Sequence, residues 1–468
     1  SKEVIMWPSS SIMEIDLLTD NIKNMVNSLR FSFIKLKESQ DKLYRQAYYD
    51  SLTNLPNRLF FKKYLKDEIK DCENRICVMF MDLNRFKTIN DTMGHDIGDK
   101  LLVLVAERLK SLQDEKHHIF RLGGDEFVIV SKVNSIEEIK NDGIRAVEIF
   151  KEKFILEDKF SVKITGSIGA SIYPQDGTDI DKIIKYADIA MYESKCNGGN
   201  SLYLFNDTLK KEFYEKATIE KEVKNAIENS ELYLEYQPQV SAKDGKIRGV
   251  EALLRWKNDR LGIVPPDKFI PIAEESEVIL EIDKWVISEV CKVIRMLQDE
   301  GYNNITISAN VSAKHFVNDD ILDLVLGCIN KNNIDPKLLK IEITESTLVK
   351  NVSTVKRILE RFKEIGIRTS MDDFGKGYSS LNILTSLPID EVKIDMELIK
   401  NILNNNKKRK IVNLILELAH DLNLSVVAEG IEVKEEKLFL EKMGCDYFQG
   451  YYFSKPIALD KVKELLDK

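Results

Sequence analysis

A chain of 468 residues is longer than one ordinary hydrophobic core supports, and it predicts two or three domains. Its composition, 43% apolar and 31% charged, is that of a folded globular protein and excludes an intrinsically disordered one. The net charge of −8 argues against nucleic acid as a bulk partner, because contacts to many phosphates need clustered Lys and Arg. Small nucleotides stay open as ligands, since metal ions can neutralise their charge locally.

The six cysteines form no C-x-x-C pair, and none lies beside a His at the spacing of a zinc site. We interpret them as ordinary buried thiols in a reducing compartment. The sequence shows no signal peptide and no apolar run long enough to span a membrane. We therefore expect this chain to be cytoplasmic.

Residues 1–46 predict a signalling helix. Five repeats of seven residues favour a coiled coil that holds two chains side by side, and the alternative is one amphipathic helix lying on its own domain. The stretch MEIDLLTDNIKNMVNSL is similar to the second helix of a HAMP signalling module, which implies a longer protein with an inner-membrane sensor upstream. The apolar residues of the repeat are Ile15, Ile22, Leu29, Leu36 and Leu43.

Residues 47–206 alternate strand-like and helical runs, which predicts an α/β domain. ICVMFMD is a buried strand ending in Asp82, and a turn from Gly123 to Glu126 joins HHIFRL to FVIVSK. The turn alone is an ordinary hairpin. A second acid on a hairpin beside Asp82 can, however, hold Mg²⁺ between the two, and glycines let phosphates approach the backbone. This arrangement suits a nucleoside triphosphate.

A Lys- and Glu-rich helix over 207–229 leads to a second unit, 230–468. Short apolar strands recur there, each followed by a helix-length segment, and this alternation predicts a (β/α)8 barrel. The active site of such a barrel lies at the C-terminal ends of its strands.

Eight polar residues fall at the ends of seven of these predicted strands. Any one of them is most simply a satisfied polar group in the core, but eight at corresponding positions indicate a site. Five carboxylates and an Asn amide are hard oxygen ligands that suit Mg²⁺ or Mn²⁺ rather than zinc. Adjacent carboxylates can reach two metal ions, which activate a water for displacement at phosphorus, and a lysine adds positive charge or orients that water. The eight residues are Glu251, Asn310, Glu342, Asp372, Asp373, Lys393, Glu429 and Gln449.

The motifs EALLRW, SANVS, EITES, DDFGKGYSSL, VKID, AEGIE and QGYYFSKP, in this order, resemble the EAL phosphodiesterase family from Leu232 to Lys468. The resemblance implies metal-dependent hydrolysis of cyclic di-GMP to linear pGpG. It implies two metal ions held by Glu251, Asn310, Glu342, Asp372, Asp373 and Glu429, with Lys393 and Gln449 as further catalytic residues. It also implies contacts to cyclic di-GMP from Gln237 and Arg255, and support by Glu345 of a mobile loop from Asp373 to Leu381.

The alternative is a non-catalytic receptor that binds cyclic di-GMP without cleaving it. Such a receptor is expected to have lost metal ligands or residues of the mobile loop, and none is lost here. The sequence therefore favours the enzyme.

The motifs DSLTNLPNR, MDLNRFKTIND, GHDIGD, RLGGDEF and YESKCNGGN resemble the GGDEF family of diguanylate cyclases from about Asp50 to Asn206. The resemblance implies a domain with a central antiparallel sheet, in which two GTP molecules, one on each subunit of a homodimer, condense to cyclic di-GMP. It implies Mg²⁺ ligands at Asp82, the Leu83 carbonyl and Asp125, with Glu126 as a further catalytic acid. The GTP contacts that it implies are Asn90, His95, Asp99, Gly123, Gly124 and Lys195.

Two departures from the GGDEF pattern bear on activity. Gly199 stands where the family has an arginine that contacts phosphate, and the loss of one such contact costs about 1.5–3 kcal/mol of binding free energy. The inhibitory R-x-x-D motif is absent, with Asp114 and His117 at its positions, so no product-feedback site is expected. We expect this half either to bind GTP and regulate the barrel or to retain cyclase activity.

Overall fold

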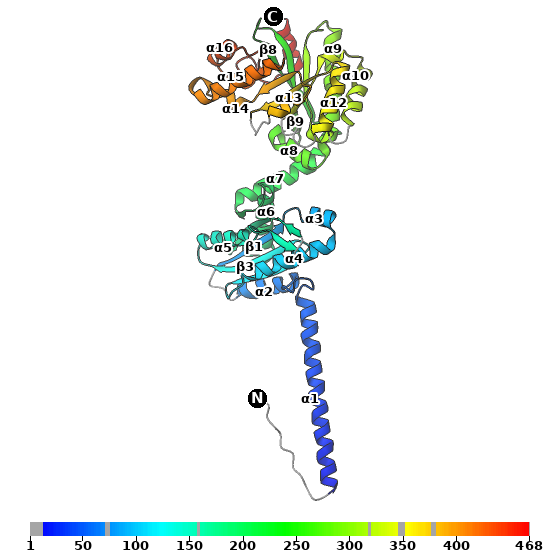
Figure 1. The fold of residues 1–468 in the computed structure, drawn as a ribbon, viewed down its shortest axis with the longest axis vertical. Helices are drawn as coiled ribbons and strands as arrows, with labels where there is room; N and C mark the ends of the chain where they lie inside the picture. The colour runs from blue at the N-terminus through cyan, green and yellow to red at the C-terminus, as the bar shows by residue number, and fades with distance from the viewer. Residues whose placement is uncertain are drawn as a thin grey trace. The chain divides into compact units, whose positions relative to one another are not determined.

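The computed structural model describes residues 13–70, 75–156, 160–316, 320–344, 352–375 and 381–467. It divides into two compact units, Ser1–Tyr214 and Glu215–Lys468, and each is described by itself (Figure 1). Among the helices within these ranges, none combines the length and apolar character needed to span a lipid bilayer.

The first unit begins with the 36-residue helix α1 (Met13–Tyr48), as the sequence predicts (Figure 1). Its apolar stripe is exposed, with Leu29 61%, Leu36 57% and Leu43 63% accessible to solvent. A helix that lies on its own domain buries such a stripe, so the structure contradicts that alternative. The side chain of Ile15 lies outside the described residues.

A five-stranded sheet in the order β2-β3-β1-β6-β7 is the centre of the first unit. β1 pairs antiparallel with both β3 and β6, which confirms the central antiparallel sheet, and β7 joins β6 in parallel. The strands are β1 (Arg75–Leu83), β2 (His117–Gly123), β3 (Glu126–Val133), β6 (Gly166–Tyr173) and β7 (Leu202–Leu204), and a separate small hairpin is formed by β4 (Phe154–Leu156) and β5 (Phe160–Val162).

Apolar clusters cover both faces of this sheet. Met79 and Met81 of β1 pack in one cluster, whereas Val78 and Phe80 pack in the other, because successive strand residues point to opposite faces. This explains why β1 is a continuous apolar run. The helices of the unit are α2 (Arg58–Lys70), α3 (Phe86–Met93), α4 (His95–Lys110), α5 (Ile136–Glu148) and α6 (Ile180–Cys196), and α7 (Asp207–Val223) continues into the second unit.

The second unit is a barrel. A nine-stranded sheet closes on itself because β8 pairs with both β9 and β16, and only the short β10 lies outside the ring. This confirms the predicted barrel fold. The strands are β8 (Leu232–Ser241), β9 (Ile247–Asn258), β10 (Gly262–Val264), β11 (Thr306–Asn310), β12 (Leu339–Thr344), β13 (Arg368–Phe374), β14 (Glu391–Ile394), β15 (Ser425–Ala428) and β16 (Tyr447–Phe448).

One strand departs from the regular strand–helix repeat that the sequence analysis expects. β8 is antiparallel to both of its neighbours, whereas β9 and β11 to β16 run in parallel. The cause is local, since only residues 242–246 separate β8 from β9 and no helix intervenes. A connection this short can join antiparallel strands but not parallel ones.

Helices cover the outside of the barrel, and one continuous apolar cluster fills the space between them and the strands. Ile341 and Ile343 of β12 belong to this cluster, whereas Lys340 and Glu342 alternate with them and are buried on the opposite face. The barrel interior is therefore polar. The helices are α8 (Pro266–Glu275), α9 (Val278–Asp299), α10 (Asp320–Asn332), α12 (Val352–Ile365), α13 (Leu381–Ser386), α14 (Met396–Ile399), α15 (Asn406–Asp421), α16 (Lys434–Lys442) and α17 (Leu459–Leu466), with 3₁₀ turns at η1 (Ala313–Phe316), η2 (Pro336–Leu338) and η3 (Ile402–Asn404).

Candidate active sites

Lys393 is the centre of a polar cluster inside the barrel. Its Nζ atom lies 2.6 Å from Glu342 Oε2, 2.8 Å from Glu429 Oε1, 3.1 Å from Glu251 Oε2 and 3.2 Å from Asp372 Oδ1. The Lys393 side chain is fully buried, so four carboxylates face one ammonium group away from water. Because buried charge is costly unless opposite charge meets it, this excess of negative charge indicates a site built for additional cations.

Two amide side chains hold Glu251 within this cluster. Gln449 Nε2 donates to Glu251 Oε2 at 2.6 Å, and Asn310 Nδ2 donates to Glu251 Oε1 at 2.8 Å. Both oxygens of Glu251 therefore have a fixed partner. The structure brings together seven of the eight residues singled out from the sequence by direct hydrogen bonds or ion pairs: Glu251, Asn310, Glu342, Asp372, Lys393, Glu429 and Gln449.

Burial and neighbouring charges together set the pKa values of the cluster. Burial raises the pKa of Glu342 and that of Glu429, and nearby carboxylates raise both further, against the opposing effect of Lys393. For Glu251, burial also raises the pKa, but Lys393, Gln449 and Asn310 together outweigh it and the net shift is downward. Glu251 is thus ionised readily, whereas Glu342 and Glu429 need more positive charge nearby to ionise.

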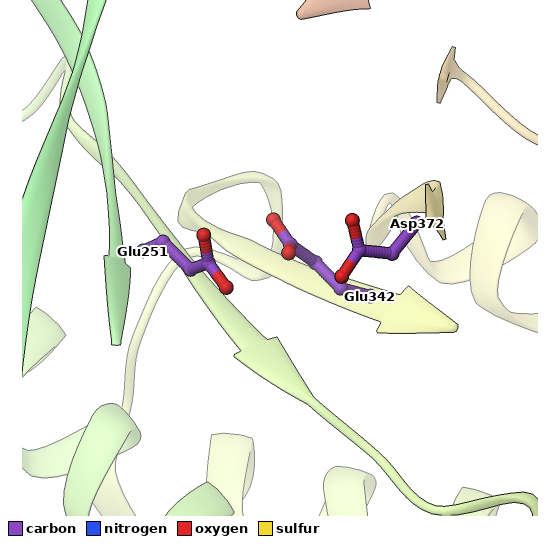
Figure 2. A group of neighbouring side chains, drawn as sticks. All are labelled: Glu251, Glu342 and Asp372. Atoms are coloured by element: carbon purple, nitrogen blue, oxygen red, sulfur yellow. The ribbon is translucent and has the colours of Figure 1, made fainter. Parts of the chain in front are cut away.

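Three of these carboxylates are arranged as a metal site requires. Ligand oxygens of Glu251, Glu342 and Asp372 all lie within 4.8 Å of one another. Figure 2 shows the three carboxylates converging from β9, β12 and β13. Glu342 Oε1 is buried and has no hydrogen-bond partner among the described residues. Oxygen donors with a vacant lone pair fit a hard divalent cation, so the residues present fit the metal that the sequence predicts.

The eighth residue, Asp373, follows Asp372 at an irregular strand end. The register between β13 and β14 shifts between Met371 and Phe374, and Asp373 has φ 59°, in the left-handed region. Adjacent residues of a regular strand point to opposite faces, and a bulge changes these directions. This bulge explains how two consecutive acids can occur at one strand end. Residues 376–380 of the predicted mobile loop, and Glu345, lie outside the described residues.

The two predicted substrate contacts lie on the adjoining strands β8 and β9. Gln237 Oε1 accepts from Gln449 Nε2 at 3.0 Å, which joins Gln237 to the cluster. Arg255 is engaged elsewhere, since its Nε donates to Glu235 Oε2 at 2.8 Å. Gln239 is a further member of the cluster that was not predicted, and its Nε2 donates to Gln449 Oε1 at 3.0 Å. Its spacing of two residues from Gln237 is the signal that places both on one strand face.

The first unit holds a second group of acids. Asp82 is the last residue but one of β1 and lies opposite Glu126 of β3, and Lys195 Nζ lies 2.7 Å from Asp82 Oδ1. Burial raises the pKa of Asp82, and the nearby charges of Asp125 and Glu126 raise it further, against the effect of Lys195. The structure therefore brings Asp82, Leu83, Asp125, Glu126 and Lys195 together where β1 ends and β3 begins, and their role in binding Mg²⁺ and GTP stays a prediction.

The turn beside these acids is open. Gly123 and Gly124 have φ values of 139° and 53°, and an added Cβ at either would meet no atom within 4 Å. Space above a glycine backbone is what an approaching phosphate needs.

The remaining predicted GTP contacts lie on α3 and α4. Asn90 Oδ1 is buried with no partner among the described residues, and a Cβ added at Gly98 would lie only 1.9 Å from it. Gly98 therefore makes room for the Asn90 amide. His95 and Asp99 are exposed residues of α4, and Asp99 directly follows Gly98, which adjoins Asn90.

The three-dimensional surroundings of Gly199 could not be inferred from the amino-acid sequence. Gly199 has φ 70°, and an added Cβ would lie 2.3 Å from Asn84 Nδ2. Asn84 is itself fixed, because it donates to Thr165 Oγ1 at 2.9 Å and accepts from Ser167 Oγ at 2.8 Å. The local structure is thus built around a glycine rather than merely lacking the family's arginine.

The fold and these two sites define a tandem arrangement of a GGDEF and an EAL domain, and the chain belongs to this family. The EAL domain family matches residues 220–456, and the family described as "Diguanylate cyclase, GGDEF domain" matches residues 47–201.

The chain is similar to several curated proteins. It is 38% identical to the signaling protein YkoW of Bacillus subtilis over 92% of this chain and 54% of that protein. It is 34% identical to the cyclic di-GMP phosphodiesterase NbdA of Pseudomonas aeruginosa over 92% and 55%, and 35% identical to the bifunctional diguanylate cyclase/cyclic di-GMP phosphodiesterase MucR of the same organism over 91% and 63%. The chain thus spans between about half and two thirds of these relatives.

Solved structures give the same picture. The structure of the PaMucR phosphodiesterase in complex with c-di-GMP is 36% identical, with a TM-score of 0.51, and covers 52% of this chain and 99% of that one. A Vibrio cholerae LapD structure with an S helix, GGDEF and EAL covers 90% of this chain and 100% of that one at a TM-score of 0.54. At 19% identity the second likeness supports the fold alone.

Proposed function

We propose that the barrel hydrolyses cyclic di-GMP to linear pGpG with two divalent metal ions, Mg²⁺ or Mn²⁺. The observation that carries the proposal is the carboxylate cluster around Lys393, in which Glu342 Oε1 is buried without a partner among the described residues. The likeness to NbdA and MucR, which are named as cyclic di-GMP phosphodiesterases, supports the same substrate. The competing proposal is a receptor that binds cyclic di-GMP without cleaving it.

The cluster assigns a role to each part of the site. When bound, the metal ions supply an activated water and neutralise charge at the phosphate, and Glu251, Asn310, Glu342, Asp372, Asp373 and Glu429 would hold them. Water adds to one phosphorus atom, the bond from phosphorus to the 3′ oxygen breaks, and a proton passes to that oxygen. Lys393 holds the carboxylates in position through its ion pairs and orients the attacking water.

Two hydrogen bonds prepare the site for its substrate. Gln449 fixes Glu251 through the 2.6 Å contact and fixes Gln237 through the 3.0 Å contact, so one amide positions a metal ligand and a substrate residue together. Arg255 binds a phosphate of cyclic di-GMP in exchange for its present partner Glu235.

We further propose that residues 47–206 bind GTP with Mg²⁺ and either regulate the barrel or keep diguanylate cyclase activity. The supporting observations are the unpartnered buried oxygen of Asn90, within the described part of the chain, and the open turn at Gly123 and Gly124. Asp82, the Leu83 carbonyl and Asp125 would hold the Mg²⁺.

The same proposal assigns the remaining segments. Residues 1–46 act as a signalling helix that pairs with a second copy, 207–229 act as a linker helix, and 230–468 act as the phosphodiesterase. The exposed apolar stripe of α1 supports the homodimer, because pairing would bury it. An upstream membrane sensor would change the pairing of this helix.

The test is to incubate the purified chain with cyclic di-GMP and either Mg²⁺ or Mn²⁺, with and without GTP, and to follow pGpG by chromatography. Glu251→Ala is run beside the surface control Glu364→Ala, and binding of cyclic di-GMP is measured in parallel. Formation of pGpG that only Glu251→Ala abolishes supports the enzyme, and a faster rate with GTP supports regulation by the first half. Tight binding without pGpG under either metal would leave the receptor.

A further inference from the structure

A cavity lies at the end of the barrel where the parallel strands begin. It has a volume of about 290 Å³ and is lined by residues from all eight strands of the closed ring. Lys340, Arg368 and Glu391 lie near the starts of their strands, whereas the metal-site residues of the same barrel lie further along. The cavity is therefore separate from the site proposed above, and its lining is mainly polar.

Arg368 is the basic residue of this cavity whose side chain has no partner among the described residues. Within the described part of the chain its side chain has no hydrogen bond or ion pair, and it is exposed to solvent. The other arginine of the lining, Arg248, is bonded to Asp244. A guanidinium group with free donors in a polar cavity favours an oxyanion, which it can bind through two parallel hydrogen bonds.

Both acids of the lining have hydrogen-bond or ion-pair partners within the protein. Glu391 Oε1 lies 2.7 Å from the buried ammonium of Lys340, and Glu391 Oε2 accepts from Ser425 Oγ at 3.3 Å. Asp390 Oδ2 accepts from the backbone amide of Thr369 at 2.8 Å. Among the basic residues of the lining, Arg368 is the one whose side chain has no ion pair within the described part of the chain.

We propose that the N-terminal end of the barrel is a binding site for a small molecule carrying a phosphate-like or sulfate-like oxyanion. Arg368 binds the oxyanion, and hydroxyl groups of the lining, among them Thr306 and Tyr447, bind the rest of the molecule. A volume of about 290 Å³ is more than a bare oxyanion needs and fits a small ester of it.

The cavity is joined to the catalytic cluster by an unbroken chain of buried hydrogen bonds. Lys340 Nζ donates to Gln239 Oε1 at 3.2 Å, Gln239 Nε2 donates to Gln449 Oε1 at 3.0 Å, and Gln449 Nε2 donates to Glu251 Oε2 at 2.6 Å. We therefore expect a ligand that shifts Lys340 to change the position of Glu251 as well. This effect on catalysis rests on the proposed function, whereas binding of the oxyanion does not.

The test is equilibrium dialysis of the full chain against radiolabelled inorganic sulfate, with EDTA present so that no metal site binds it, and with chloride at constant ionic strength. Arg368→Gln is compared with Arg361→Gln, an exposed arginine outside the cavity that pairs with Glu364. We expect wild type and Arg361→Gln to bind sulfate equally. We expect Arg368→Gln to bind sulfate at least about tenfold more weakly than wild type. Equal binding by all three proteins, or none by wild type, would overturn the proposal.

The second measurement is the rate of pGpG formation with and without sulfate at constant ionic strength. We expect sulfate to change the rate of wild type and of Arg361→Gln but not that of Arg368→Gln. If none of the proteins forms pGpG, the proposed hydrolysis is refuted, and the dialysis result still decides the oxyanion site.

Discussion

Lys393 Nζ and Glu342 Oε2 lie 2.6 Å apart inside the barrel, and neither side chain has more than 1% of its surface exposed. Three further carboxylates contact the same ammonium group. The lysine is therefore the one internal cation that opposes a group of buried negative charges within the described site.

Replacement of this lysine tests that balance. We expect Lys393→Met to lower the free energy of unfolding by about 3–5 kcal/mol in the absence of metal, because it leaves buried carboxylates without their cation. Urea unfolding with EDTA measures the loss. Lys224→Met is the control, because Lys224 pairs with Glu220 at the surface and such pairs contribute about 1 kcal/mol or less. Equal losses in both variants would contradict the account.

Asp283 predicts a pH dependence of stability. Its carboxylate is buried and accepts from the Ser312 amide at 3.0 Å, and burial, with a smaller effect of Glu274, raises its pKa to about 7. His315 also faces it, with Nε2 at 3.7 Å from Asp283 Oδ2. The pKa of Asp283 in the folded protein is above its unfolded value of about 3.9, so the fold favours the protonated carboxyl. The contribution of Asp283 to the free energy of unfolding is therefore complete below a pH of about 4 and is lost as the pH rises to about 7.

The matching variant is Asp283→Asn, which keeps an oxygen for the Ser312 amide but cannot ionise. We expect its unfolding free energy to change less between pH 4 and pH 7 than that of wild type, by up to about 4 kcal/mol. Denaturant unfolding at a series of pH values measures the difference. Parallel curves for the two proteins would show that Asp283 does not titrate in this range.

The surroundings of Gly199 predict that a side chain introduced at this position destabilises the first unit. We expect Gly199→Ala to destabilise the first unit by about 1–3 kcal/mol, because the new Cβ meets Asn84 Nδ2 at 2.3 Å and the backbone is left-handed. Gly198→Ala is the control, since Gly198 also has positive φ but an added Cβ there meets no atom within 4 Å. Thermal unfolding should separate the two variants, and identical melting temperatures would rule out the clash with Asn84.

The stripe on α1 predicts self-association. We expect Leu29→Glu combined with Leu36→Glu to lower the dimer fraction at least about tenfold, because charges on the seam of a coiled coil are costly to bury. Sedimentation velocity measures this fraction. Asn27→Glu combined with Ile34→Glu adds the same charge off the seam and should leave the dimer unchanged. Dissociation by both pairs of substitutions would show that the seam is not specific.

The sequence predicts the polar strand ends because each interrupts an apolar run, and a buried polar residue at that position needs a partner. Seven of the eight then meet in space, and their metal-binding role stays a prediction. The contact of Gln239 with Gln449 could not be predicted from the sequence, since only closure of the ring by β8 brings the two side chains together. The reversed direction of β8 follows from a short turn, and the periodicity of a strand is the same in both directions.

The environment of Gly199 shows a second limit. A sequence shows which side chain is missing, but the side chain that occupies the space, here Asn84, comes from a different part of the chain. The contact of Arg255 with Glu235 shows a third limit of prediction from sequence, because it depends on the pairing of β8 with β9.

The central claim is that the carboxylates around Lys393 bind the metal ions that hydrolyse cyclic di-GMP. The most direct measurement is the initial rate of pGpG formation as Mn²⁺ is titrated into the EDTA-treated chain, for wild type and for Glu342→Gln. We predict no product without metal, a saturable rise for wild type, and a rate lower by about a hundredfold or more for Glu342→Gln. A rate that is the same with EDTA as with Mn²⁺, or the same for both proteins, would contradict the claim.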